Sequence, residues 1–158
     1  DFMAQDEQDP ATYNDAYFQQ RNPVTCEGLV QLTTGAPLPH YNGGLLVTRL
    51  RHFDAQRQRP GLPPDVAALV SGLSDDRTEL TLVNLSASQR REVLVQAGGM
   101  GEHQFTAVRA DQAAERVAVD ANTLQVDLPP GTQIKLDLGM KRFVHEPSLA
   151  LPFQKAES

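Results

Sequence analysis

The second half of the chain contains short runs in which apolar and polar residues alternate, a pattern typical of β-strands with one buried face. The alternation is strict over residues 123–128 and 133–138. Further strands are predicted at 45–53, 80–85, 92–96, 104–109 and 116–119, with turn residues between most of them. The apolar positions of the two strict runs are predicted to face one common core: Leu124, Val126, Leu128, Ile134, Leu136 and Leu138.

Strands that follow one another so closely suit an antiparallel sandwich better than βαβ units, which need long crossover connections. The predicted fold class is therefore mainly β: an antiparallel β-sandwich with one short helix and an irregular N-terminal segment. Residues 45–138 are assigned to the sandwich and residues 1–44 to a linker or the end of a preceding domain.

The first half of the chain is patterned less clearly. Residues 65–70 are predicted to form a short helix with a proline near its first turn, and another could start near Pro10 or Thr12. The apolar run at 27–32 fits a helix or a strand, because periodicity cannot separate the two in so short a run. In the strand at 45–53, Arg49, Arg51 and His52 predict that part of it meets solvent.

Residues 33–44 concentrate turn-forming residues and two prolines, which predicts a stiff irregular loop. This loop brings together His40, Tyr41 and Asn42, which are candidates for contact with a ligand or a partner domain. The alternative is a linker packed against the sandwich.

Residues 139–158 lose the alternation, and their prolines exclude a long helix or a central strand. We interpret them as an extended docking tail, either laid over this domain's core or reaching another domain. Cutting after Gly139 is expected to leave the sandwich folded, since its last strand is predicted to end at Leu138, but to abolish association with a larger part. The apolar residues of the docking tail are Phe143, Leu149, Leu151 and Phe153.

Length, charge and cysteine content restrict the possible roles. A chain of 158 residues suits one domain with a tail. A net charge of −6 disfavours a nucleic-acid partner. The apolar stretches are far shorter than the roughly 20 residues that cross a bilayer, so no membrane partner is expected. The single cysteine, Cys26, excludes an intrachain disulfide and leaves the compartment open.

The chain begins at Asp1 with an acidic, Gln-rich stretch that lacks the regions of a signal peptide. A removed tag, a processed chain or a fragment of a longer protein would each explain this start. We favour the fragment.

No pattern of residues predicts catalysis, a metal or a cofactor. Gly98-Gly99-Met100-Gly101 lies between two predicted strands, whereas a phosphate loop needs a helix after it, so a turn with positive φ is expected. The chain shows no Gly-x-Ser-x-Gly motif and no pair of carboxylates that stands out. Its four histidines lack the spacing of zinc sites: His40, His52, His103 and His145.

Two resemblances bear on function. Residues 80–86, 91–96 and 128–136 resemble the C-terminal β-domains of multidomain carbohydrate-active enzymes, in which a Val-Asn-Leu-Ser type strand opens the domain and a Pro-Pro-Gly type turn precedes its last strand. Residues 41–46, 60–70 and 139–144 are similar to the ends of large bacterial α/α-barrel proteins labelled linalool dehydratase/isomerase-like. Both resemblances imply that the catalytic residues lie in a helical or barrel domain outside this chain.

Three functions follow, in order of preference. The first is a non-catalytic accessory domain that packs on a larger catalytic domain or subunit. The second is an independent carbohydrate-binding module, although the chain has no Trp to stack on sugar rings. The third is a small self-contained enzyme, which would need a cleft with converging titratable residues.

Overall fold

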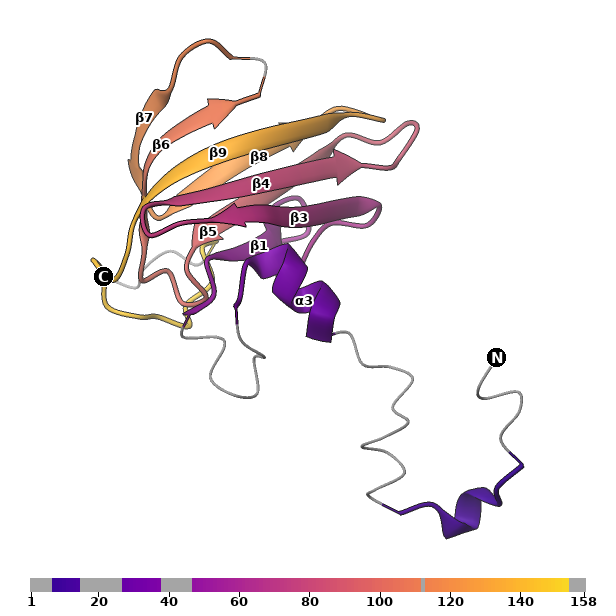
Figure 1. Cartoon of the computed structure of the whole chain (residues 1–158). Helices are drawn as coiled ribbons and strands as arrows, with labels where there is room; N and C mark the ends of the chain where they lie inside the picture. The colour runs from indigo at the N-terminus through magenta and orange to yellow at the C-terminus, as the bar shows by residue number, and fades with distance from the viewer. Residues whose placement is uncertain (1–6, 15–26, 38–46, 112, 154–158) are drawn as a thin grey trace.

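The computed structural model describes residues 7–14, 27–37, 47–111 and 113–153. In these ranges the chain forms two antiparallel sheets that pack face to face, with one α-helix beside them (Figure 1). The predicted mainly β, antiparallel sandwich is confirmed. The elements are the 3-10 turn η1 (Pro10–Thr12), α3 (Glu27–Thr34), β1 (Leu50–Asp54), β2 (Arg59–Pro60), β3 (Val66–Leu73), β4 (Arg77–Asn84), β5 (Arg91–Ala97), β6 (Gln104–Ala110), β7 (Val117–Ala121), β8 (Thr123–Leu128) and β9 (Gln133–Lys141).

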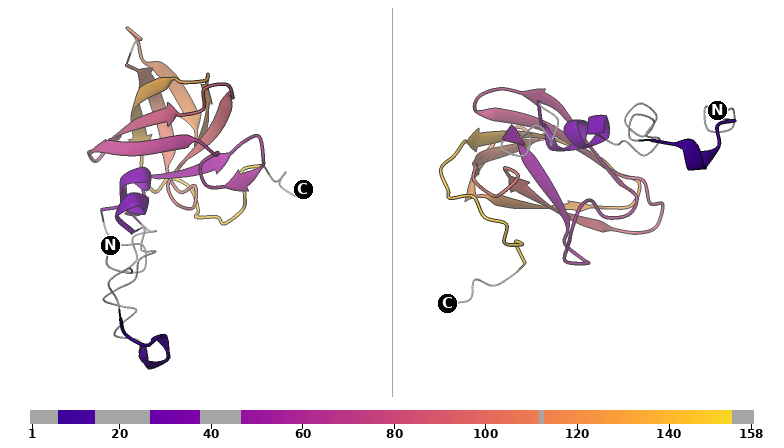
Figure 2. Two further views of the ribbon diagram at one scale, coloured as in Figure 1. Left: turned by 90° about the vertical axis from the view of Figure 1, so that its right-hand side faces the viewer. Right: turned by 90° about the horizontal axis from the view of Figure 1, so that it is seen from below.

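The two sheets have different sizes. The four-stranded sheet has the order β2-β1-β5-β8, and the five-stranded sheet has the order β3-β4-β9-β6-β7. Helix α3 lies against β3 and β1 and covers that side of the sandwich (Figures 1 and 2). The opposite side is bounded by the edge strands β8 and β7.

The core lies between the sheets and is filled by apolar side chains from both. Strands β8 and β9 belong to different sheets, so the two strictly alternating runs face the core from opposite sides. The prediction of a common core is confirmed: Val126, Leu128, Leu136 and Leu138 are buried, and Leu124 and Ile134 are partly buried against them. The fully buried apolar side chains include Leu50, Phe53, Leu80, Leu82, Val93, Val95 and Phe105.

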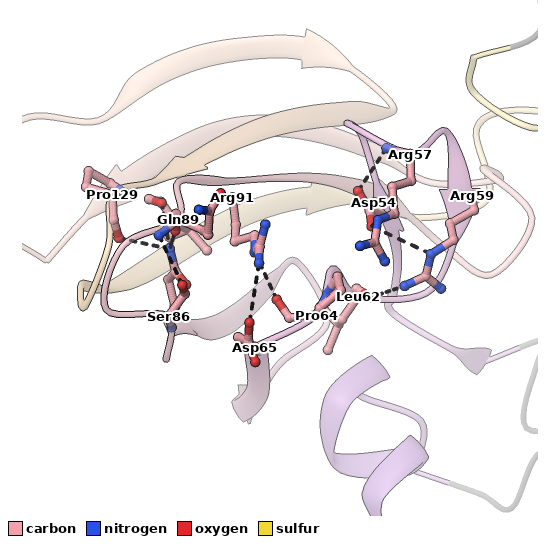
Figure 3. A network of polar contacts seen from close by, with 12 residues as sticks. Asp54, Arg57, Arg59, Leu62, Pro64, Asp65, Ser86, Gln89, Arg91 and Pro129 are labelled. Carbon is pink, nitrogen blue, oxygen red and sulfur yellow. Dashed lines mark hydrogen bonds and ion pairs between the residues drawn. The ribbon is translucent and has the colours of Figure 1, made fainter.

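The Pro-Pro-Gly connection carries the chain from one sheet to the other instead of forming a hairpin, and Asn84 holds it in place. The Asn84 amide is buried and donates to the carbonyl oxygens of Gln89, Leu128 and Pro129 at 2.7, 3.0 and 3.1 Å. Its own oxygen accepts the N–H of Ser86 at 3.0 Å. Figure 3 shows Ser86, Gln89 and Pro129 gathered at this point.

The predicted helix at 65–70 is wrong, because these residues begin strand β3. The strand pairs with β4 so that Val66 lies opposite Asn84 and Val70 opposite Leu80. Asp65 has a φ of 62° and turns the chain into the strand, where its carboxylate pairs with Arg91 at 3.3 Å. Six residues are too few to stabilise a helix by themselves, and pairing with β4 decides the structure.

The open choice at 27–32 is settled in favour of a helix, because these residues lie in α3. The expectation that Arg49 and His52 meet solvent is wrong, since both are buried. The reason is α3: the His52 Nε2–H donates to the carbonyl oxygen of Thr33 at 2.6 Å, and the Arg49 N–H donates to that of Thr34 at 3.1 Å.

The last strand is longer than predicted. Strand β9 continues past Leu138 to Lys141, and Met140 is only 3% exposed and belongs to the core. A cut after Gly139 would therefore remove part of the sandwich, so the residues that leave the sheet begin at Arg142. The division of the chain at residue 44 stays a prediction, although α3, which lies before it, packs on the sandwich.

Candidate functional site

The turn between β5 and β6 wraps around the carboxylate of Glu102. Gly98 and Gly101 have φ angles of 89° and 71°, as expected for a turn with positive φ. A Cβ atom on Gly98 would clash with the Glu102 carboxylate, which would have to move, and the positive φ would add backbone strain. The Met100 N–H donates to Glu102 Oε2 at 2.8 Å. The glycines of this turn therefore make room for a buried acid.

Glu102 and His103 belong to a buried polar cluster that also contains Arg49 and the partly buried Arg142, whose charges act on His103. Glu102 and His103 are 2% and 0% exposed, and the His103 Nε2 lies 3.8 Å from Glu102 Oε1. The His103 Nδ1 accepts the N–H of Phe143 at 3.1 Å, so the neutral ring carries its proton on Nε2, toward Glu102. Burial lowers the pKa of His103, and the charges of Arg142 and Arg49 lower it further, against the opposing effect of Glu102.

The residues after β9 are attached to this turn through their backbone. The N–H groups of Val144 and His145 donate to the Glu102 carbonyl oxygen at 2.9 and 3.2 Å, and that of Ser148 donates to Met100 at 2.8 Å. The Phe143 ring stands edge-on to His103, with centroids 4.7 Å apart. Residue Phe143 has a φ of 55°, an unusual value for a bulky residue, which indicates that these contacts hold it in place.

The predicted docking residues divide into two groups. Phe143 and Leu149 are 60% and 74% exposed, whereas Leu151 and Phe153 are partly buried. The Phe153 ring packs edge-on against the core residue Phe53, with centroids 5.6 Å apart. The docking tail therefore lies partly on its own sandwich. The loop residues His40, Tyr41 and Asn42 lie outside the described residues, so their contact role stays a prediction.

The titration of His103 leads to a test of the cluster. Because its pKa is lower in the folded chain than its ordinary value of 6.5, the unfolded chain binds more protons just below pH 6.5. Above pH 6.5 the ring is neutral in both states, so the protonation of His103 should not lower the free energy of unfolding. Below pH 6.5 the free energy of unfolding should fall as the pH decreases toward the pKa of His103 in the folded chain. Urea unfolding of the parent and of His103→Asn between about pH 8 and pH 5 should show a shallower loss in the variant.

Asparagine suits this test because its side-chain oxygen can still accept the Phe143 N–H but does not titrate. His52 is buried and its pKa is lowered in the same direction, so the variant should keep part of the dependence. Equal pH dependence of parent and variant would show that His103 is not the titrating group.

Apolar side chains are also exposed on the side of the sandwich covered by α3. Leu29 and Leu32 of α3 are 67% and 52% exposed, and Leu69 and Leu73 of β3 are 44% and 45% exposed. Figure 1 shows α3 directly beside β3. These four leucines belong to α3 and β3 and not to the docking tail.

The sequence did not predict the Glu102 cluster, because its members come from segments far apart in the chain. One signal was present: Glu102 and His103 are polar residues directly after a glycine turn and before a strand. In the described part of the chain, no group of three His, Cys, Asp or Glu side chains is placed to hold a metal ion. None of the described helices has the length and apolar content needed to cross a membrane.

Glu102 and His103 are both buried, and their hydrogen bonds fix the backbone of Phe143, Val144 and His145. Comparison of the chain with protein-family models, with curated proteins and with solved structures found no match.

Proposed function

We propose that this chain is a non-catalytic accessory β-sandwich domain that packs on a larger catalytic part, of the carbohydrate-active or α/α-barrel class that its sequence resembles. The docking tail carries the proposal. Its backbone is attached to the Met100–Glu102 turn, while Phe143, Val144 and Leu149 are 60%, 48% and 74% exposed.

This arrangement favours binding for two reasons. A segment that is already fixed loses little conformational entropy when it docks. Complete burial of a large apolar side chain contributes about 1.5 to 3 kcal/mol, so a few such residues supply a substantial part of an interface. The buried cluster beneath the docking tail supports the same role, since it holds Phe143 and Val144 in one orientation.

The test is association with the polypeptide encoded directly upstream of Asp1. Leu149→Ser is expected to weaken binding by about tenfold or more, because it removes an apolar side chain that the interface would bury. Leu69→Ser is the matched control: it removes an exposed leucine from β3 and should leave binding unchanged. Titration calorimetry on the purified parts measures both.

Two results would reject this proposal. One is an upstream region that encodes no larger domain. The other is unchanged binding by Leu149→Ser together with weaker binding by Leu69→Ser, which would assign the interface to β3 and α3.

The alternative function, a carbohydrate-binding module, is favoured by a polar groove of about 290 Å³ on the outer face of the larger sheet. Charged side chains that can hydrogen-bond sugar hydroxyls line it: Glu79, Arg109, Asp111, Lys135 and Asp137. Asp137 is ion-paired with three arginines, Arg77, Arg109 and Arg116. Calorimetry with a panel of oligosaccharides, repeated on Arg109→Ala, tests this function.

A further inference from the structure

A second, apolar groove of about 310 Å³ lies between β8 and the β6–β7 pair, where no described element covers the sandwich. In Figure 1 the β6–β7 pair forms the edge of its sheet that lies away from α3. Aliphatic side chains dominate the lining: Val108, Ala110, Val117, Leu124, Val126, Ile134 and Leu136. Val117 is 63% exposed, so apolar surface here faces solvent.

The groove runs beside a free strand edge. Among the described strands, β8 pairs with β5 on one side only. The Ala97 N–H donates to the Asn122 carbonyl oxygen at 2.8 Å, just before β8 begins. Antiparallel pairing alternates from there, so the backbone groups of Leu124 and Val126 point toward β5, and those of Gln125 and Asp127 point away from it.

The polar residues around the groove are predominantly acidic. Glu115 and Asp127 belong to its lining, and Glu92 accepts a hydrogen bond from Gln125, another lining residue. Arg90 pairs with Asp127 and balances only one of these carboxylates. A second copy of this chain, whose net charge is −6, would bring the same acidic surface and be repelled. The complementary partner carries basic residues.

We infer that this groove binds an extended segment of a partner protein as an added strand on β8. The segment has aliphatic residues at every second position, which enter the groove, and basic residues at its ends, which face the carboxylates. The backbone of such a segment pairs with the free edge of β8, and its alternate side chains fill the apolar groove. A small apolar molecule would fill the groove but leave the strand edge unpaired. This inference does not depend on the docking tail.

The probe is a synthetic peptide of alternating valine and threonine with lysines at both ends. Titration calorimetry with the parent chain should detect binding, and Gln125→Pro should weaken it by about tenfold or more. Proline removes an N–H from the free edge of β8 without touching the bonds to β5, a position where strands tolerate it. Gln125→Ala is the matched reference: it removes the same side chain and keeps the N–H, so the difference in binding between the two variants measures the contribution of the N–H.

Hydrogen exchange on the parent chain gives a second measurement that needs no variant. The amides of Gln125 and Asp127 should exchange at least about tenfold more slowly with the peptide bound, since they become paired. Four results would overturn the inference: no binding to the parent chain, equal binding to Gln125→Pro in its folded form, unchanged exchange at both amides, or equal binding of a peptide with glutamates in place of the lysines. Unchanged exchange with binding retained would indicate a site for apolar molecules instead.

Discussion

Truncation of Leu136 to alanine is expected to lower the free energy of unfolding by about 2 to 5 kcal/mol, the range for removing a large buried side chain. Leu136 is 4% exposed, lies opposite Leu80 in the ladder and packs in the core between the sheets. The loss should lie toward the lower end of the range, because the apolar groove reaches this residue and lets the site relax or take up water. Urea unfolding measures the change.

Two companion variants sharpen this test. Leu138→Ala should cost more than Leu136→Ala, since Leu138 is fully buried and is not part of the groove lining. Gln133→Ala, at an exposed position of the same strand, should change stability by no more than about 0.5 kcal/mol. If Leu136→Ala cost as little as Gln133→Ala, the orientation of β9 would be wrong.

Replacement of Asn84 by alanine is expected to cost about 2 to 4 kcal/mol, although it removes little apolar surface. The side chain is 1% exposed, and its amide and carbonyl together make four hydrogen bonds to backbone groups of the loops at this end of the sandwich. Without it, the buried carbonyl oxygen of Leu128 loses a donor that water cannot easily replace. Urea unfolding again measures the loss.

Gln89→Ala is the control for Asn84, because Gln89 receives the Asn84 bond through its backbone oxygen and its own side chain is exposed. It should therefore change stability by less than about 0.5 kcal/mol. A loss for Asn84→Ala no greater than that of this control would mean that the loops hold their positions without the amide.

The prediction of buried residues from the sequence was most accurate for strands that have one buried face and one solvent-exposed face. In β8 and β9 the alternation names the buried residues directly, because successive side chains point to opposite sides of a sheet. It did not predict which strands pair. Strand β1 pairs with β5 and β4 pairs with β9, across long stretches of chain, and such pairing depends on the whole fold and leaves no local pattern.

For short apolar runs, the secondary structure was predicted wrongly or left open. Residues 65–70 and 27–32 each offered about six residues, and one became strand β3 while the other became helix α3. In both runs, tertiary packing determines the secondary structure. Strand β3 pairs with β4, and α3 packs on the side of the sandwich formed by β3 and β1.

The candidate site was predicted only in part. Phe143 and Leu149 were named as candidate docking residues because apolar residues recur among the prolines of the docking tail; both are exposed, and their docking role stays a prediction. It could not show that Phe143 is held by His103, a residue 40 positions earlier, because that contact exists only after β6 and β9 are paired. For the same reason Arg49, buried beside α3, was expected in solvent.

The position of β9 in its sheet affects how the chain can fold while it is being synthesised. This strand is the last of the described strands, yet it lies in the middle of the five-stranded sheet, between β4 and β6. Until the ribosome has released Lys141, β4 and β6 each keep an unpaired edge, the kind of surface through which nascent chains aggregate. The β3–β4 and β6–β7 pairs can form earlier, but the five-stranded sheet is complete only after β9 has been translated.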